Sequence, residues 1–196
     1  MNMYLIRHAQ TTMNAVGKVF SGSTDVSLSE KGRATVREMS TNHLWERIEH
    51  VFVTPLIRTH QTADILFGDR IERTVVPELA EVDFGDYEGK IRDSSNADDP
   101  IFYKWVHDPE NLTFPNGENL LVHVDATLKA LTNIARGNIW RDVAIVSHAT
   151  TIRLVLAVLL TGTIKCFRNV PCDNCCVTLI ESDCGGLHVK YINAPL

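Results

Sequence analysis

Short apolar segments alternate with longer segments of helical pattern along most of the chain, and this alternation restricts the fold more than any other feature. Strands are predicted at 4–6, 51–53, 74–76 and 143–146, and helices at 29–45, 101–106 and 151–160. Strands that alternate with helices form a mainly parallel sheet with helices on both faces, and ligands bind beyond the carboxyl ends of its strands. The predicted fold class is therefore α/β, a three-layer sandwich around a mainly parallel sheet.

Polar residues predict where the helices begin. Ser29 is placed to cap the 29–45 helix, and Thr54 to cap a helix whose first turn holds Pro55 and, one turn in, Arg58. Asn116 is predicted to cap another helix, whose buried face is formed by apolar residues three and four positions apart, at Leu120, Val124, Leu128 and Leu131. Two final strands are predicted at 177–180 and 187–192, joined by a turn at 183–186.

Two of the predicted strands lead directly into a histidine. The first continues into Arg7-His8, and the 143–146 strand continues into Ser147-His148. Imidazoles delivered to neighbouring strand ends can converge on one small anion, and the planar guanidinium of Arg7 suits phosphate oxygens. Arg58 adds a second charge near a helix N-terminus, where backbone N–H groups also favour anions. A lone histidine or arginine at a strand end is more often structural, but the set predicts phosphoryl chemistry on histidine.

Length and charge narrow the class of protein. At 196 residues, the chain is expected to form one domain over 1–196. A net charge of −5 and a pI of about 5.9 disfavour nucleic acid and anionic membranes as partners. The longest apolar run, at 154–160, is far shorter than the ~20 residues that span a bilayer. We therefore expect a soluble, cytoplasmic protein.

The cysteines lie together near the C-terminus. There are five of them, an odd number that fits reduced thiols better than a closed disulfide framework, at positions Cys166, Cys172, Cys175, Cys176 and Cys184. Cys172-x-x-Cys175 offers the start of a zinc site, but no second pair with metal-ligand spacing follows. We expect no metal and keep a zinc-bound interaction domain as a distant alternative.

Six blocks of the sequence follow one another in an order typical of a known family. They lie at 5–14, 28–32, 54–63, 79–89, 114–118 and 146–149. The first reads L-I-R-H-A-Q-T-T-M-N and resembles the Arg-His-Gly-x-Thr-x-x-Asn signature of the histidine phosphatase superfamily, also called the phosphoglycerate mutase-like family. The fourth is similar to Leu-x-Glu-x-Asp-Phe-Gly-x-Trp-Glu-Gly, and the last to Val-Ser-His-Gly. Ala9 and Ala149 replace glycines of the family pattern, while the reactive side chains are kept.

This resemblance implies a phosphoglycerate mutase-like fold and assigns roles to the residues of the motifs. His8 becomes the nucleophile that accepts the phosphoryl group, with its other ring nitrogen donating to an acceptor such as a backbone carbonyl. Arg7, Arg58 and His148 hold the phosphoryl oxygens, and Asn14 adds a neutral donor unless it is only a turn residue. No cofactor is implied. The remaining histidines match no motif and are expected to be ordinary residues: His43, His50, His60, His107, His123 and His188.

Other parts of the motifs surround this group. Glu81 matches the family's acidic residue, which protonates the leaving alkoxide and then activates water, although a loop ion pair is the plainer interpretation. Ser21 and Gly22 match positions that line the substrate mouth in relatives. The segment 88–115 is expected to roof the site, and its aromatic residues are expected to pack over the core rather than stack on a substrate: Phe102, Tyr103 and Trp105.

The leading hypothesis is a metal-independent phosphomonoesterase that acts on a small phosphorylated metabolite through phosphohistidine, of the α-ribazole phosphate or broad-specificity type. A cofactor-dependent phosphoglycerate mutase is the alternative enzyme. Mutases of the family carry adjacent arginines in a longer segment after the Glu-x-x-x-Gly block. In this chain, the Lys and Arg residues of 90–115 are only Lys90, Arg92 and Lys104, and none are adjacent. An inactive phosphate-binding module is the alternative of another class. The apolar C-terminal strands are a candidate contact for a homodimer.

Overall fold

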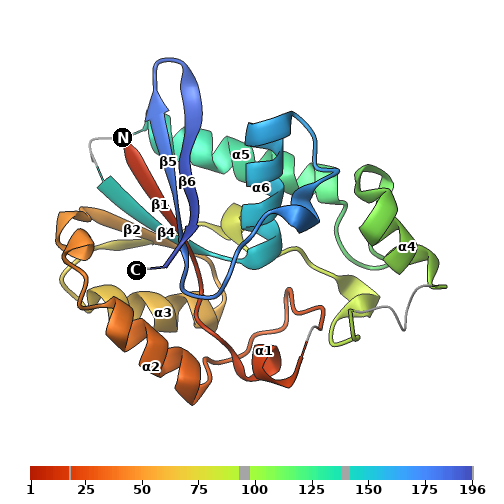
Figure 1. Cartoon of the computed structure of the whole chain (residues 1–196), viewed down its shortest axis with the longest axis horizontal. Helices are drawn as coiled ribbons and strands as arrows, with labels where there is room; N and C mark the ends of the chain where they lie inside the picture. Colours follow the sequence, from red (N-terminus) through yellow and green to blue (C-terminus); the bar gives the residue numbers. More distant parts are fainter. Residues whose placement is uncertain (18, 93–97, 138–141, 196) are drawn as a thin grey trace.

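A six-stranded sheet forms the centre of the molecule, with the strand order β3-β2-β4-β1-β5-β6 (Figure 1). The computed structural model describes residues 1–17, 19–92, 98–137 and 142–195. The strands are β1 (Asn2–Arg7), β2 (His50–Val53), β3 (Arg73–Val75), β4 (Asp142–Ser147), β5 (Val177–Asp183) and β6 (Gly186–Ala194). The first four in spatial order are parallel, and β5 and β6 continue the sheet in antiparallel orientation. The mainly parallel sheet is confirmed.

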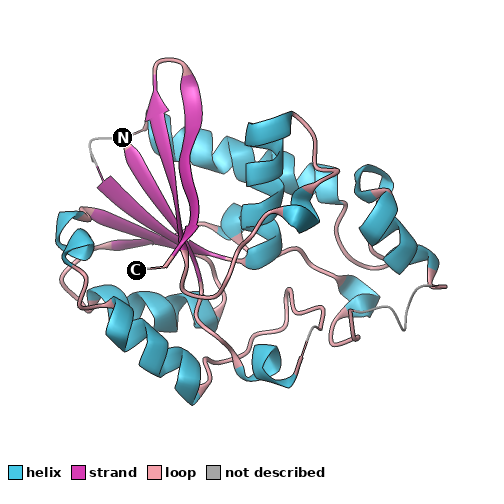
Figure 2. Ribbon diagram, viewed as in Figure 1, coloured by secondary structure: helices cyan, strands magenta, loops and turns pink. Residues whose placement is uncertain are grey.

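Helices cover both faces of the sheet, as the alternating pattern predicted (Figure 2). On one face lie α2 (Glu30–Met39) and α3 (Ile57–Phe67), and on the other α5 (Leu120–Arg136) and α6 (Ala149–Thr161). Successive residues of β1 point to opposite layers: Met3 and Leu5 join the core under α5 and α6, and Tyr4 and Ile6 join the core under α2 and α3. The three-layer sandwich is therefore confirmed.

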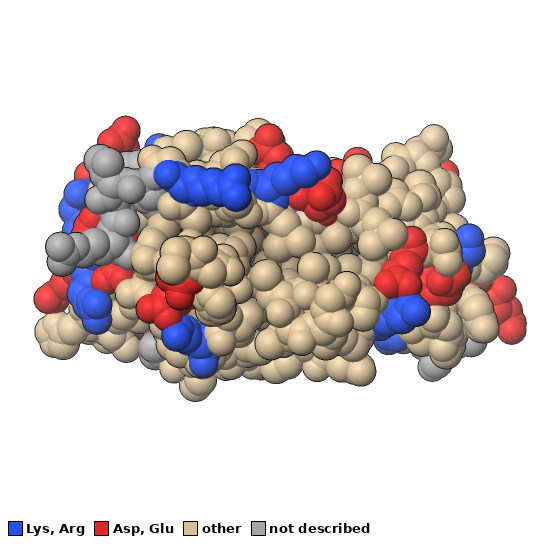
Figure 3. Space-filling model, turned by 90° about the horizontal axis from the view of Figure 1, so that it is seen from above, with Lys and Arg blue, Asp and Glu red and all other residues tan. Residues whose placement is uncertain are grey.

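Shorter helices connect these layers. They are α1 (Thr12–Val16), α4 (Pro100–His107) and the 3₁₀ turns His43–Arg47, Pro77–Leu79, Gly85–Tyr87, Pro109–Asn111 and Phe167–Asn169. No helix among the described residues is both long and apolar enough to cross a membrane. The face of the molecule seen in Figure 3 carries acidic and basic side chains beside one another around a largely uncharged middle.

The predicted end of the first long helix was wrong because short polar side chains bind the backbone there. The helix predicted over 29–45 ends at Met39, since Ser40 and Thr41 turn their hydroxyls back to the carbonyls of Arg37 and Glu38. Ser29 does cap its start, accepting the N–H of Gly32 at 3.0 Å.

The starts of two further helices also differ from the prediction. The helix after β2 begins at Ile57 with Leu56 as its N-cap, not at Thr54, whose hydroxyl is bonded to the side chains of Thr59 and His148. The cap of α5 is Asn119 instead of Asn116: the Asn119 side chain accepts the N–H groups of two first-turn residues, whereas Asn116 lies before the helix with φ +54°. The apolar face is confirmed, with Leu120, Val124 and Leu131 buried.

The segment predicted as a roof packs beside the main sandwich. Phe102 and Trp105 of α4 are buried, as expected, while Tyr103 is exposed. Trp105 contacts Phe20, Phe84, Phe114 and Phe167 edge-on or at a tilt, and these rings belong to the hydrophobic core that lies under α5 and α6. Part of the segment, 93–97, lies outside the described residues, and a roofing role stays a prediction.

Candidate active site

Adjacent strands bring the two motif histidines together. Arg7 at the end of β1 pairs with Ser147 at the end of β4, so the next residue on each strand, His8 or His148, leaves the same edge of the sheet. The N–H of His8 donates to the Ser147 carbonyl at 3.0 Å. The ring centroids of His8 and His148 are 5.2 Å apart, and the residues are only 5% and 0% exposed. The predicted convergence of these two imidazoles is thus present in the structure.

The ring of His8 is held with one nitrogen free. Its Nδ1 lies 2.7 Å from the carbonyl oxygen of Ala9. A carbonyl only accepts, so Nδ1 carries the proton and the lone pair of the neutral ring is on Nε2. Burial, followed by the charges of Arg58 and Arg7, holds the pKa of His8 well below its ordinary value. His8 therefore presents an unprotonated nitrogen at neutral pH, in the arrangement expected for a nucleophile.

His148 is fixed in the opposite tautomer. The Nε–H of Arg58 donates to His148 Nδ1 at 3.2 Å, so this nitrogen is unprotonated. The proton is then on Nε2, which lies 2.9 Å from the hydroxyl of Thr54. Burial, followed by the Arg58 charge, holds the pKa of His148 well below its ordinary value. His148 is consequently a neutral hydrogen-bond donor.

Arg58 is anchored from three sides. It is 1% exposed, and besides His148 it donates to the carbonyl oxygens of Gly22 at 2.7 Å and Thr24 at 2.9 Å. A guanidinium has five N–H groups, so two remain for an oxyanion. Arg58 is the second residue of α3 and not one turn in, because the helix begins at Ile57, after Pro55; the connection after β2 nevertheless brings its charge to this site.

Arg7 is bound to the C-terminal part of the chain. Its Nη1 donates to the Cys172 carbonyl at 2.7 Å, and its buried Nε has no hydrogen-bond partner among the described residues. Burial is the first cause that lowers the pKa of Arg7. The remaining N–H groups of Arg7 are available to an anion in front of His8.

Glu81 lies across the site at the N-terminus of α6. Its carboxylate accepts the backbone N–H groups of Val82 at 3.1 Å, Thr150 at 3.0 Å and Thr151 at 3.1 Å. These bonds fix a buried carboxylate at the start of a helix, where the helix dipole favours negative charge. The plainer interpretation as a loop ion pair receives no support, because no ion pair to Glu81 occurs within the described part of the chain.

The remaining residues that the family motifs predict for the site differ from one another in where they lie. Asn14 and Ser21 line the cavity at His8. Asn14 also accepts the N–H of Thr11 at 3.3 Å in a capping box at α1, so it has the turn role as well. Gly22 is buried and does not line the described cavities; its carbonyl holds Arg58 and its N–H donates to Glu88 at 2.9 Å. Its contribution is to position Arg58.

The alanines that replace family glycines do not strain the backbone. Among the described residues, the non-glycine residues with positive φ are Asn116, Cys175 and Asn193, so neither Ala9 nor Ala149 adopts a conformation that needs glycine. Ala149 begins α6 and lines the cavity.

Two connected cavities open in front of His8. The inner one, of about 30 Å³, is lined by Arg7, His8, Asn14, Val19, Ser21, Glu81, Phe84, Arg92, Ala149 and Thr150. The outer one, of about 520 Å³, shares half of its lining with the inner one and adds Gly17, Trp105, Arg153, Arg168 and Asn174. The cavity at the predicted site is therefore much larger than a phosphate group and is rich in arginine.

Sequence reasoning missed several of these residues. Arg153 and Arg168 match no motif, yet Arg153 is the one charged residue in the apolar segment 151–160, which was a usable signal. Thr54 was interpreted as a helix cap and instead contacts His148. His123, expected to be ordinary, is buried with its Nε2 3.1 Å from the Thr151 hydroxyl, beside Glu81.

The cysteines are free thiols in the described structure. No group of three or more His, Cys, Asp or Glu side chains with metal-site geometry occurs in the described residues. Burial raises the pKa of the thiols of Cys172 to about 11 and Cys175 to about 12, so both are protonated at neutral pH. The zinc-bound interaction domain therefore has no support.

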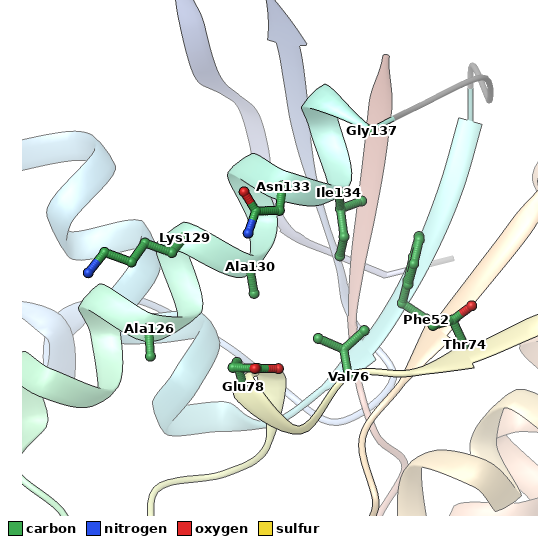
Figure 4. Close-up of a pocket in the computed structure, with 10 residues that line it drawn as sticks. All are labelled: Phe52, Thr74, Val76, Glu78, Ala126, Lys129, Ala130, Asn133, Ile134 and Gly137. Carbon is green, nitrogen blue, oxygen red and sulfur yellow. The ribbon is translucent and has the colours of Figure 1, made fainter.

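Another cavity lies away from the histidines, between α5 and the exposed edge of the sheet at β3 (Figure 4). It has a volume of about 640 Å³, and its wall includes Phe52, Val76 and Ile134. Its charged lining residues are Glu78 and Lys129, and it holds no histidine or cysteine. This cavity has none of the groups that phosphoryl chemistry needs.

The fold and the site together define a class: an α/β protein in which two neutral histidines and two arginines gather at the carboxyl edge of the sheet, with His8 and Arg7 lining an arginine-rich cavity. A family comparison agrees, since residues 3–195 match the histidine phosphatase superfamily (branch 1). The chain belongs to that superfamily and is a phosphatase by class.

Individual relatives cover almost the whole chain. Phosphoserine phosphatase 1 of Hydrogenobacter thermophilus is 28% identical over 92% of this chain and 86% of its own length. The adenosylcobalamin/alpha-ribazole phosphatase of Salmonella typhimurium is 26% identical over 99% of this chain and 96% of its own length. Among solved structures, YhfR of Bacillus stearothermophilus has a TM-score of 0.88 at 26% identity, covering 100% of this chain and 97% of its own.

Proposed function

We propose that the protein is a metal-independent phosphomonoesterase that hydrolyses a small phosphorylated metabolite through a phosphohistidine at His8. The observation that carries the proposal is the Nδ1 bond of His8 to the Ala9 carbonyl, which leaves Nε2 free in a cavity also lined by Arg7 and Glu81. The names of the relatives from Hydrogenobacter and Salmonella support a phosphatase and make α-ribazole phosphate and phosphoserine early substrates to test.

In the first step, Nε2 of His8 attacks phosphorus and the bond from phosphorus to the leaving oxygen breaks. Charge spreads over the three remaining phosphoryl oxygens, where Arg7 and Arg58 supply N–H groups. His148 positions Arg58: its Nδ1 accepts the Arg58 Nε–H, and its own N–H is bonded to Thr54. The arginines are held in place before substrate binds, so little reorganisation is needed in the transition state. Losing one such donor costs about 3 kcal/mol, or roughly two orders of magnitude in rate.

Glu81 transfers a proton in each of the two steps. The first step requires Glu81 in its protonated form: as the ester bond breaks, the leaving oxygen takes that proton and departs as an alcohol, which leaves the Glu81 carboxylate. In the second step, the Glu81 carboxylate takes a proton from water, whose oxygen attacks phosphorus and releases inorganic phosphate and neutral His8. Its hydrogen bonds to the N-terminus of α6 keep the carboxylate oriented through both steps.

The direct test compares wild type with His8→Ala on p-nitrophenyl phosphate in the presence of EDTA, with the exposed His43→Ala as the control. We expect full activity in EDTA for wild type and the control, and a loss of at least about 10³-fold for His8→Ala. Rapid quenching with a radiolabelled substrate is expected to trap acid-labile, base-stable label on His8. Equal and negligible release from wild type and His8→Ala would instead indicate an inactive phosphate-binding module.

A phosphoglycerate mutase is the second candidate, because one relative is a probable phosphoglycerate mutase of Erwinia tasmaniensis, 27% identical over 92% of this chain. The enzyme is mixed with 3-phosphoglycerate and 2,3-bisphosphoglycerate, and isomerisation is compared with phosphate release. We expect release to dominate. Isomerisation that is much faster than release would favour the mutase.

A further inference from the structure

The outer part of the cavity carries more positive charge than a single phosphate group requires. The proposed function assigns Arg7 and Arg58 to the reacting phosphoryl group, and the outer cavity of about 520 Å³ is also lined by Arg92, Arg153 and Arg168. These three come from separate parts of the chain: the segment after Tyr87, helix α6 and the 3₁₀ turn Phe167–Asn169. The fold thus brings distant arginines to one place.

One of these arginines packs against aromatic rings, and a second has a buried N–H group without a partner. The guanidinium carbon of Arg92 lies 5.6 Å from the ring centre of Phe20 and 5.7 Å from that of Trp105, within cation–π range of both. The Nε of Arg153 is buried and has no hydrogen-bond partner among the described residues. A buried N–H without an acceptor is costly, so it points to an acceptor that binds in the cavity.

The cluster is not neutralised within the described part of the chain. No ion pair within 4.0 Å involves Arg92, Arg153 or Arg168. Burial lowers the pKa of Arg92 to about 10, with the neighbouring arginines adding to the effect and Glu81 opposing it. Like charges gathered in a half-buried cavity repel one another, and an anion that binds there relieves the repulsion.

We propose that the substrate carries a second acid group, a carboxylate or a further phosphate, which Arg92, Arg153 and Arg168 bind at the outer end of the cavity. The assignment of the inner end to the cleaved phosphate rests on the proposed function. An ester whose organic part is uncharged leaves these three arginines unpaired, so the second acid group sets the preferred substrate class.

Binding to His8→Ala, which lacks the proposed nucleophile, tests this inference without turnover. Calorimetry compares 3-phosphoglycerate with glycerol 3-phosphate and fructose 1,6-bisphosphate with fructose 6-phosphate; each pair differs in one acid group. We expect the more acidic member of at least one pair to bind at least about tenfold more tightly, with the preference shrinking as salt is raised. The carboxylate and bisphosphate pairs distinguish the two kinds of acid group.

Substitutions in the same background locate the effect. Arg153→Met and Arg168→Met are expected to reduce the preference by about tenfold while changing the affinity for the less acidic member by no more than about twofold. Arg37→Met, on the exposed side of α2, is the matched control. Arg168 is exposed at the rim, so its variant is expected to fold even if Arg153→Met does not.

The inference is overturned if neither pair shows a preference, or if both arginine variants weaken the two members of a pair equally. Phosphate release by wild type separates this result from the proposed function. Phosphate release without a binding preference for the more acidic member would support the proposed phosphatase and refute the second subsite. Preferential binding of the more acidic member without phosphate release from any of these esters would refute the proposed phosphatase and support the subsite.

Discussion

Arg58 donates its Nε–H to Nδ1 of His148 at 3.2 Å, which places a guanidinium directly against a neutral imidazole. The bond requires an unprotonated Nδ1, so the permanent charge in the site belongs to arginine and not to histidine. The same guanidinium is the second cause that lowers the pKa of His8, after burial. Arg58 thus adds to the effect of burial in keeping both rings neutral, and it brings positive charge for a phosphoryl group.

The first prediction concerns the titration of His8. Because its pKa lies well below the ordinary value of about 6.5, the nucleophile stays unprotonated as the pH falls through that value. We expect the acid limb of kcat/KM to lie below pH ~6.5 and the imidazole NMR signals of His8 to stay those of the neutral ring there. Arg58→Met is expected to move the titration of His8 upward, whereas Arg37→Met leaves it unchanged. Protonation of His8 near its ordinary value in wild type would contradict this account.

The second prediction concerns stability against pH. His8 and His148 take up protons in the unfolded chain near pH 6.5 but not in the native protein until a lower pH. Their contribution to stability is therefore fully present above about pH 6.5 and is lost as the pH falls below it, by up to about 1.4 kcal/mol per pH unit for each ring. Urea unfolding from pH 7 downward measures this slope, which must be shallower in His8→Ala. An unchanged slope would show that His8 is protonated equally in both states.

The strand ends were predictable from sequence because apolar runs and motifs coincide there. Arg7, His8 and His148 follow buried segments directly, and parallel pairing of the strands fixes their proximity. Glu81 was found only through its motif, since its partners are backbone N–H groups of a helix 70 residues away in sequence. Contacts of this kind leave no pattern in the local sequence.

Other features depend on tertiary contacts, which compete with local sequence preferences and cannot be read from them. Threonine is a residue type that commonly caps helices. The hydroxyl of Thr54, however, is bonded to His148, and the helix begins later. Arg168 is exposed and lies in a short 3₁₀ turn, where an arginine is unremarkable until the fold brings it near Arg153. The arginine cluster could therefore be recognised only in three dimensions.

The third prediction concerns Thr54, whose buried hydroxyl lies 2.9 Å from His148 Nε2. Thr54→Val keeps the shape of the side chain but leaves this N–H without its acceptor, which is expected to cost about 1–3 kcal/mol in the free energy of unfolding. Thr54→Ser retains the hydroxyl and is expected to lose less. Denaturant unfolding of both variants checks the order, and a valine variant as stable as the serine variant would show that the bond is not needed in the free protein.

The fourth prediction concerns Gly22, which holds Arg58 through its carbonyl. A Cβ at this position would lie 1.9 Å from the Val82 carbonyl oxygen and 2.6 Å from Glu88, so Gly22→Ala forces the loop away from its place. We expect a loss of about 1–3 kcal/mol in stability together with reduced kcat, because Arg58 loses an anchor. Gly185→Ala, where only side-chain atoms lie near the added methyl, is the control. An unaffected Gly22→Ala would mean that the loop can shift without moving Arg58.

The last prediction separates the two steps assigned to Glu81. Glu81→Gln cannot transfer a proton, so alkyl phosphates, whose leaving oxygen needs one, are expected to lose about 10²–10⁴-fold in kcat/KM. p-Nitrophenol leaves without protonation, and its release from His8-bound phosphate should still be fast. Hydrolysis of the phosphohistidine also needs Glu81, so the variant is expected to release one equivalent of p-nitrophenol in a burst and then turn over slowly. Stopped-flow absorbance measures the burst, with the exposed Glu78→Gln as the control. If both classes of ester slow equally and no burst appears, Glu81 orients the N-terminus of α6 and does not transfer the proton.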